Sequence, residues 1–137
     1  MILKIKKFQQ SFTHLEQVKY ALRSRGMHKE IHDISIELPQ IGYIVEKDSY
    51  AVASGFLRVI EGNVAMLDSL VTHADCTPVD RDTAIDMVVQ ALISKAKELN
   101  IKQIIAFSRD KNTLERSLRH GFVRQDHAFI ALDLSGE

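Results

Sequence analysis

Three segments rich in β-branched and aromatic residues follow one another in the middle of the chain, and two short polar stretches separate them. The segments are Ile41–Glu46, Tyr50–Ile60 and Val64–Val71, and the separating stretches are Lys47–Ser49 and Glu61–Asn63. Polar turns of this length join neighbouring antiparallel strands. The pattern therefore predicts a three-stranded antiparallel meander. Gly55, in the middle of one strand, indicates a bulge or a close approach of two backbones.

A long apolar stripe follows the meander and predicts a helix. Its members recur at helical spacing: Ile85, Val88, Val89, Leu92, Ala96 and Leu99. Thr77 can serve as the N-cap, Pro78 fits the first turn, and Asp80 supplies an acid three residues after the cap. We expect the helix to begin between Thr77 and Asp82 and to end at Asn100, in a left-handed conformation.

The last part of the chain predicts three further elements. Ile101–Phe107 is mostly apolar, which is typical of a strand buried on both faces. Lys111–His120 predicts a shorter helix, which Gly121 would end and on which Phe122 would pack back. Val123–Leu134 predicts one long or bent strand.

The first part is less regular. Ile2–Phe8 alternates weakly and predicts a short strand. A helix is expected next and Gly26 would end it, because apolar residues recur at helical spacing. Those residues are Phe12, Leu15, Val18 and Leu22. Met27–Leu38 fits either a helix or a strand, and Pro39 closes it in both cases.

Composition limits the class of protein. With 137 residues, of which 45% are hydrophobic and 26% charged, the chain fits a single domain over residues 1–137. It carries 18 basic and 18 acidic residues and no dense basic stripe, so we expect no nucleic-acid partner. No apolar run approaches the roughly 20 residues of a membrane span, and the first residues lack the features of a signal peptide. One cysteine, Cys76, suits a reducing compartment, so a cytoplasmic location is expected.

The order of these elements resembles the GCN5-related N-acetyltransferase (GNAT) superfamily. The segment Arg81-Asp82-Thr83-Ala84-Ile85-Asp86 is similar to the family's Arg/Gln-x-x-Gly-x-Gly/Ala loop, and His120-Gly121-Phe122 matches its Gly-Phe pair. Ala96-Lys97-Glu98, ahead of Ile101, also looks like the family. The resemblance implies an α+β fold. Its central sheet would be mixed and mainly antiparallel, with about six or seven strands flanked by three or four helices.

The resemblance also implies a cosubstrate, acetyl-CoA or another acyl-CoA. Backbone N–H groups at the start of a helix are unsatisfied and carry partial positive charge, so they can bind phosphate. The residues expected to hold the pyrophosphate are Arg81, Asp82, Thr83, Ala84, Ile85 and Asp86. Val71 and Thr72 would offer backbone groups to the pantetheine arm.

Ala84 and Asp86 occupy the two positions where the family has small residues. Asp80, Asp82 and Asp86 place three carboxylates around the helix start, and Arg81 offsets one of them. Two like charges about 4 Å apart repel by about 1 kcal/mol in water and by more in a partly dry cleft. The alternative is that these acids simply cap the helix and complement its dipole.

Two catalytic groups need candidates. Many family members protonate the CoA thiolate with a tyrosine four residues before the helix-ending glycine, and here that position is Ser117. The resemblance places Asp110 at the family's helix-starting asparagine, with Asn112 close by. A general base should take a proton from the incoming amine, and Asp68 and His73 are the candidates. Either residue could instead be an ordinary strand or loop residue.

Three hypotheses follow. The chain could be an N-acyltransferase that acts on a small-molecule or peptide amine, with specificity from residues 10–40 and the two hairpin turns. It could be an inactive GNAT domain used for binding or structure, or an unrelated α+β domain without the V-shaped gap between parallel strands. A homodimer could form through the final strand. No metal is expected, although His28 and His32 have the spacing of helical ligands.

Overall fold

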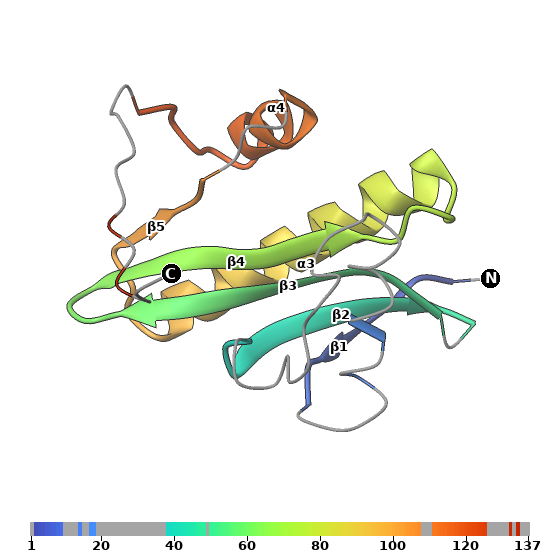
Figure 1. Ribbon diagram of the computed structural model, residues 1–137, viewed down its shortest axis with the longest axis horizontal. Coiled ribbons are helices and arrows are strands. Elements are labelled where there is room, and N and C mark those ends of the chain that lie inside the picture. The colour runs from blue at the N-terminus through green and yellow to red at the C-terminus, as the bar shows by residue number, and fades with distance from the viewer. Residues whose placement is uncertain are drawn as a thin grey trace. The chain divides into compact units, whose positions relative to one another are not determined.

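A five-stranded mixed sheet forms the centre of the computed structural model (Figure 1). The structure describes residues 2–9, 14, 17–18, 38–48, 50–107, 111–125, 132 and 134. It divides into two compact units, Met1–Phe107 and Ser108–Glu137, and each is described by itself. Among the described residues, no helix is both long enough and apolar enough to cross a membrane.

The sheet lies in the first unit, and its strands follow one another in chain order. They are β1 (Lys4–Lys7), β2 (Ile41–Lys47), β3 (Tyr50–Ile60), β4 (Val64–Thr72) and β5 (Gln103–Ile105). The first four strands pair antiparallel, whereas β5 pairs with β4 in parallel. The predicted meander is confirmed, because β2, β3 and β4 are joined by the two turns that the sequence indicates.

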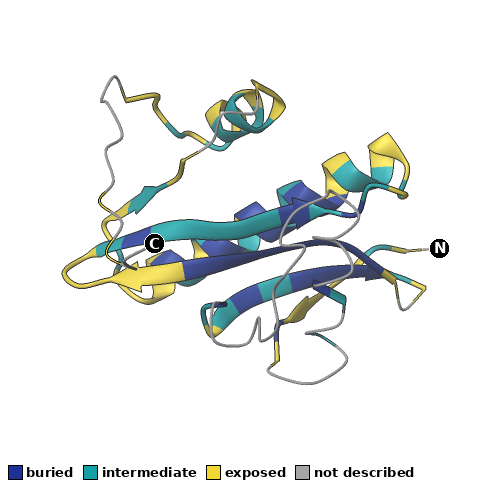
Figure 2. Cartoon of the chain, viewed as in Figure 1, coloured by how far each residue is buried: buried dark blue, intermediate teal, exposed yellow. Residues whose placement is uncertain are grey.

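One face of the sheet packs on the helix α3 (Pro78–Glu98). The apolar stripe of the helix lies against residues of β2, β3 and β4, and together they form one core cluster. Its buried members are Val45, Val52, Ala53, Leu57, Ala65, Ala84, Ile85, Val88, Leu92 and Ala96. Figure 2 shows that the buried residues concentrate on β2, β3 and α3, whereas the tip of the β3–β4 hairpin is exposed.

The opposite face of the sheet carries a second core cluster around Phe56. Its members are Phe8, Val18, Leu38, Ile44, Ala51, Phe56 and Val71. The ring of Phe8 meets that of Phe56 edge-on, with centroids 4.8 Å apart. The expected first helix contributes Val18 to this cluster, but most of that helix and most of Met27–Leu38 lie outside the described residues.

Both helices end in the same way. Asn100 has φ of 61°, and the N–H groups of Asn100 and Ile101 donate to the carbonyls of Lys97 and Ala96. In the second unit, α4 (Lys111–Arg119) ends at Gly121, whose φ is 93°. The N–H groups of Gly121 and Phe122 there donate to the carbonyls of Leu118 and Ser117. These are Schellman motifs, so the predicted ends at Asn100 and Gly121 are confirmed.

One strand prediction differs from the structure. Only Gln103–Ile105 of the expected Ile101–Phe107 is a strand, and none of its three residues is buried, so burial on both faces was wrong. The segment pairs with β4 over three residues only, which limits the surface that it can cover. Most of the predicted strand Val123–Leu134 lies outside the described residues, and its described positions, 123–125, 132 and 134, are not in a strand.

Among the described residues, five strands and two helices have defined bounds, against the six or seven strands and three or four helices expected, and His14, Gln17 and Val18 are helical as well. The α+β class and the mixed, mainly antiparallel sheet are confirmed.

Candidate functional site

The strands β4 and β5 are joined at one end and part at the other. Their pairing runs only from Val64–Gln103 to Met66–Ile105, although β4 continues to Thr72. At the joined end, the Asn63 carbonyl accepts hydrogen bonds from the N–H groups of Lys102 and Gln103, at 2.8 and 3.2 Å. Within the described part of the chain, no strand pairs with this edge of β4 beyond Met66. Figure 1 shows β5 leaving the line of β4.

A bulge in β4 lies just beyond the point where the strands part. Ser54 pairs with Val71 and Phe56 with Asp68, so Gly55 of β3 faces both Ser69 and Leu70. Ser69 accommodates the extra residue with φ of 49°. A Cβ on Gly55 would lie 2.5 Å from Leu70 Cδ1 and 2.9 Å from Val88 Cγ1. Gly55 therefore lies opposite a bulge, one of the two features that its position in the sequence predicts, and its close neighbours are side chains.

The helix α3 begins upstream of Arg81–Asp86, the segment that was expected to form a phosphate-binding loop. Thr77 is the N-cap, its side-chain oxygen accepts from the Asp80 N–H at 3.2 Å, and Pro78 is the first helical residue. The predicted cap is confirmed. However, all of Arg81–Asp86 lies inside the helix, where each N–H donates to the carbonyl four residues back. The segment is not a loop, because it has no glycine and the Thr77–Pro78 start lies upstream of it.

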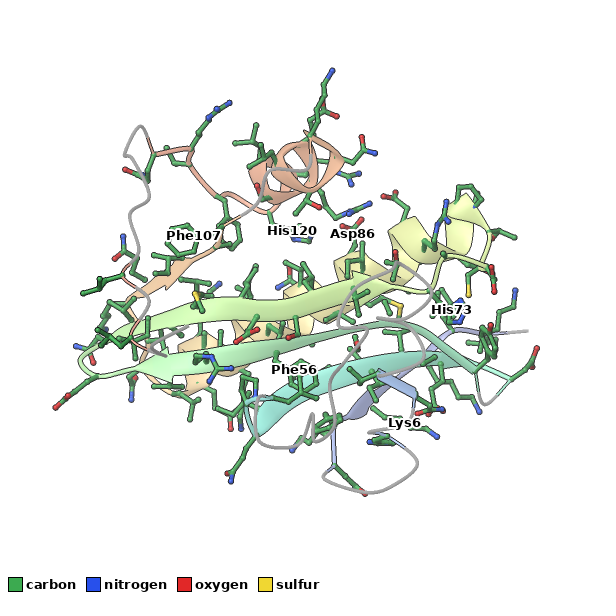
Figure 3. All side chains as sticks on the ribbon, in the orientation of Figure 1. Lys6, Phe56, His73, Asp86, Phe107 and His120 are labelled. Atoms are coloured by element: carbon green, nitrogen blue, oxygen red, sulfur yellow. The ribbon has the colours of Figure 1, made fainter. Side chains whose placement is uncertain are left out.

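The charges at this helix start are partnered differently from the sequence-based expectation. Lys47, from the end of β2, forms a 2.9 Å ion pair with Asp80. The hydrogen bond between these side chains lowers the pKa of Asp80 and raises that of Lys47. Arg81 instead donates through Nη1 to the Ala74 carbonyl at 3.0 Å. Asp82 is exposed and Asp86 is half-buried further along the helix (Figure 3).

Asp68 lies on β4 beside the bulge and is half-buried. Its Oδ2 accepts from Arg58 Nε at 2.6 Å, and its Oδ1 accepts from the Ser69 hydroxyl at 2.9 Å. Both carboxylate oxygens are therefore held in place at the part of β4 that lies beyond the pairing with β5.

His73 follows the last residue of β4 and is 1% exposed. Its Nδ1 accepts from the Asp75 N–H at 3.1 Å, and its Nε2 lies 3.1 Å from the Tyr50 hydroxyl. Sequence reasoning missed Tyr50. The antiparallel meander places the start of β3 opposite the end of β4, so counting the register from the Glu61–Asn63 turn could have brought Tyr50 near His73.

The other predicted site residues are divided between the two units. Val71 is buried and Thr72 half-buried at the end of β4, in the first unit. Asn112 and Ser117 lie on α4 in the second unit, where the Ser117 hydroxyl donates to the Leu114 carbonyl at 2.7 Å. Asp110 lies outside the described residues, as do His28 and His32.

The sequence matches no protein-family model and no curated protein. Solved structures do match. A GNAT-family acetyltransferase from Streptococcus pneumoniae aligns over 98% of this chain and 100% of its own, with a TM-score of 0.76 and 14% identity. The fold is that of the GNAT acetyltransferases.

Two further acetyltransferase structures also align over nearly their whole length. Glucosamine-6-phosphate N-acetyltransferase from Arabidopsis thaliana covers 96% of this chain and 99% of its own, with a TM-score of 0.68 and 11% identity. A predicted acetyltransferase from Clostridium acetobutylicum, solved with acetyl-CoA, covers 99% of both chains, with a TM-score of 0.66 and 19% identity. The GNAT fold and the parting of β4 from β5 argue against the unrelated α+β domain.

Proposed function

We propose that this GNAT-fold chain transfers an acyl group from acyl-CoA to the amine of a small molecule or peptide. The observation that carries the proposal is the parting of β4 and β5 beside the β4 bulge: beyond Met66, no strand of the described residues pairs with the edge of β4 that faces away from β3. An extended ligand arm can lie along a strand edge, because main-chain groups there point sideways. The acetyl-CoA complex of the Clostridium protein supports the choice of cosubstrate.

The proposed roles on β4 follow from the geometry of its last residues. The backbone of Val71 and Thr72 would align the pantetheine arm. Asp68 is the better placed base, because its carboxylate is only half-buried, beside the bulge, and Arg58 holds it in position. His73 is less suited, because it is fully buried and its Nδ1 already accepts a hydrogen bond.

The reaction would proceed by direct attack within a ternary complex. The amine nitrogen bonds to the thioester carbonyl carbon, the carbon–sulfur bond breaks, and CoA leaves as a thiolate. The amine proton passes to Asp68, and water would return a proton to the thiolate. Proximity and orientation supply much of the rate in such transfers, so a strong side-chain acid is not required.

The diphosphate of acyl-CoA fits this chain less well than the pantetheine arm. The N–H groups of Arg81–Asp86 are used within α3, and Asp82 and Asp86 add negative charge. The proposed binding is therefore weak. These observations also favour a second candidate, a GNAT-fold binding module without catalytic activity, as does the Ser117 hydroxyl bond to Leu114.

Calorimetric titration with acetyl-CoA, followed by an assay of thiol release with a panel of primary amines, separates the two candidates. Binding together with transfer to any amine would establish the acyltransferase and exclude the inactive module. No binding at millimolar acetyl-CoA would remove the acyltransferase.

Asp86 allows a sharper test of the helix start. Asp86→Asn removes the charge and keeps a side chain, whereas Asp86→Gly also loosens the backbone. If charge limits affinity, both variants bind acetyl-CoA more tightly. If the closed helix limits it, only Asp86→Gly does. Equal affinity in all three proteins would show that neither property of Asp86 limits binding.

A further inference from the structure

The loop between β4 and α3, residues 73–77, is fixed from several sides. The His73 N–H donates to the Val52 carbonyl at 2.8 Å, and the His73 carbonyl accepts from the Cys76 N–H at 3.2 Å. Arg81 reaches back from the helix to the Ala74 carbonyl. This loop joins the end of β4, the proposed pantetheine edge, to the start of α3.

The imidazole of His73 provides the link between this loop and β3. Because Nδ1 accepts the Asp75 N–H, the proton of the neutral ring lies on Nε2, which then donates to the Tyr50 hydroxyl oxygen. The two rings also pack together, with centroids 4.8 Å apart. Figure 3 shows His73 at the end of the sheet beside the start of α3.

We propose that His73 is a positioning residue for the acyl-CoA site: through Tyr50 and the Asp75 N–H, its buried Nε2–H imidazole fixes the β4–α3 loop against β3. This inference rests on the proposed function. The loop sets where α3 begins relative to Val71 and Thr72. An ångström of misplacement can cost a hundredfold in a transfer reaction, so fixing this loop has a direct effect on the site.

The same geometry argues against His73 as the base of the reaction. A proton taken at Nδ1 would face the Asp75 N–H, so two donors would meet and the loop would lose its hydrogen bond. The ring also has almost no exposed surface through which an amine could approach it.

Three substitutions separate the contributions. His73→Leu removes both ring hydrogen bonds, and His73→Asn keeps an acceptor where Nδ1 lies. Tyr50→Phe removes only the hydroxyl. Tyr43→Phe, which makes the same change at a half-buried tyrosine of β2, is the matched control. Thermal unfolding of each variant checks that it is folded, and acetyl-CoA affinity is measured by calorimetry.

We expect His73→Leu to weaken acetyl-CoA binding at least tenfold without changing KM for the amine. His73→Asn should recover most of that loss, Tyr50→Phe should weaken binding about threefold, and Tyr43→Phe should have no effect. Equal losses in His73→Leu and His73→Asn would overturn the proposal. So would a fall in kcat with unchanged acetyl-CoA affinity, which is the result expected for a base.

Nitrogen-15 NMR of the histidine ring provides a readout that needs no ligand. The proposal requires the Nε2–H tautomer, and it requires faster exchange of the Asp75 amide in His73→Leu but not in His73→Asn. An Nδ1–H tautomer or a doubly protonated ring at neutral pH would overturn it. If wild-type protein binds no acetyl-CoA, the proposed function fails, while these spectra still decide whether His73 fixes the loop.

Discussion

The carboxylate of Asp80 is neutralised by a lysine from a distant part of the chain. Lys47 lies at the end of β2, 33 positions before Asp80, and the fold brings their side chains to 2.9 Å. The sequence shows the acidic residues of this region, but it does not show that Lys47 pairs with Asp80. Lys47 belongs to the β2–β3 hairpin, and only the folded sheet brings that hairpin to the start of α3. Electrostatic repulsion at the start of α3 is therefore smaller than the sequence predicts.

Replacement of Lys47 by methionine should change how stability depends on pH. The ion pair lowers the pKa of Asp80, so its contribution is present above the unfolded-state pKa and is lost as pH falls through the folded-state value. We expect the free energy of unfolding of Lys47→Met to fall less than that of wild type between neutral and acidic pH. Urea unfolding at a series of pH values measures this difference. Lys97→Met, at an exposed position of α3, is the control and should follow wild type. Identical pH profiles for all three proteins would contradict the expectation.

The helix α3 and the bulge of β4 belong to the scale of elements, and the sequence predicts the two unequally. Apolar periodicity, the Thr77 cap and the Asn100 end each indicate α3 independently, and its observed bounds agree with them. Gly55 indicates only that strand pairing is irregular near this position. The bulge itself adds one residue to β4, and side-chain alternation there gives no sign of which residue is extra.

Loss of the Thr77 cap should destabilise the protein. The Thr77 side chain accepts the Asp80 N–H, and removal of such a cap typically costs about 1 kcal/mol. Urea unfolding of Thr77→Ala should therefore show a lower free energy of unfolding, and Thr77→Ser should restore it. Thr83→Ala, an exposed position in the same helix, should be neutral or slightly stabilising. An equal loss at both threonines would show that the cap is not the cause.

A side chain at Gly55 should disturb the packing between β3, β4 and α3. The Cβ of Gly55→Ala would meet Leu70 and Val88, and overpacking of this kind costs about 1–3 kcal/mol. If the clash is the cause, Leu70→Ala should cost less in the Gly55→Ala background than in wild type. Additive losses in the double mutant, measured by urea unfolding, would instead indicate that the contact with Leu70 is not the cause.

On the scale of the whole molecule, element order was enough to predict the GNAT fold. The meander, the long helix and the following parallel strand are each local patterns, and their order is shared with the solved GNAT structures. The state of the candidate site was less predictable. The sequence predicted the Thr77 cap and a helix start between Thr77 and Asp82, whereas the resemblance implied a phosphate loop at Arg81–Asp86. In the structure the helix begins at Pro78 and runs through those residues.

A ligand that binds only the folded chain raises its stability, so acetyl-CoA should protect the whole molecule from unfolding. At a concentration 100 times its Kd, the gain is about 2.7 kcal/mol. We expect the melting temperature to rise with acetyl-CoA concentration and to rise less with CoA fragments that lack the pantetheine arm. An equal rise with adenosine 3′,5′-bisphosphate would indicate that the strand edge of β4 contributes nothing to binding.

The double hydrogen bond at Asn63 makes the β3–β4 turn a pivot for the space between β4 and β5. The seven residues from Met66 to Thr72 span about 20 Å, and over that length a 10° change in the angle between the directions of β4 and β5 corresponds to about 3.5 Å in separation. In the proposed acyltransferase, a substitution in this surface turn would therefore alter the spacing of β4 and β5 without altering a residue proposed to contact the donor.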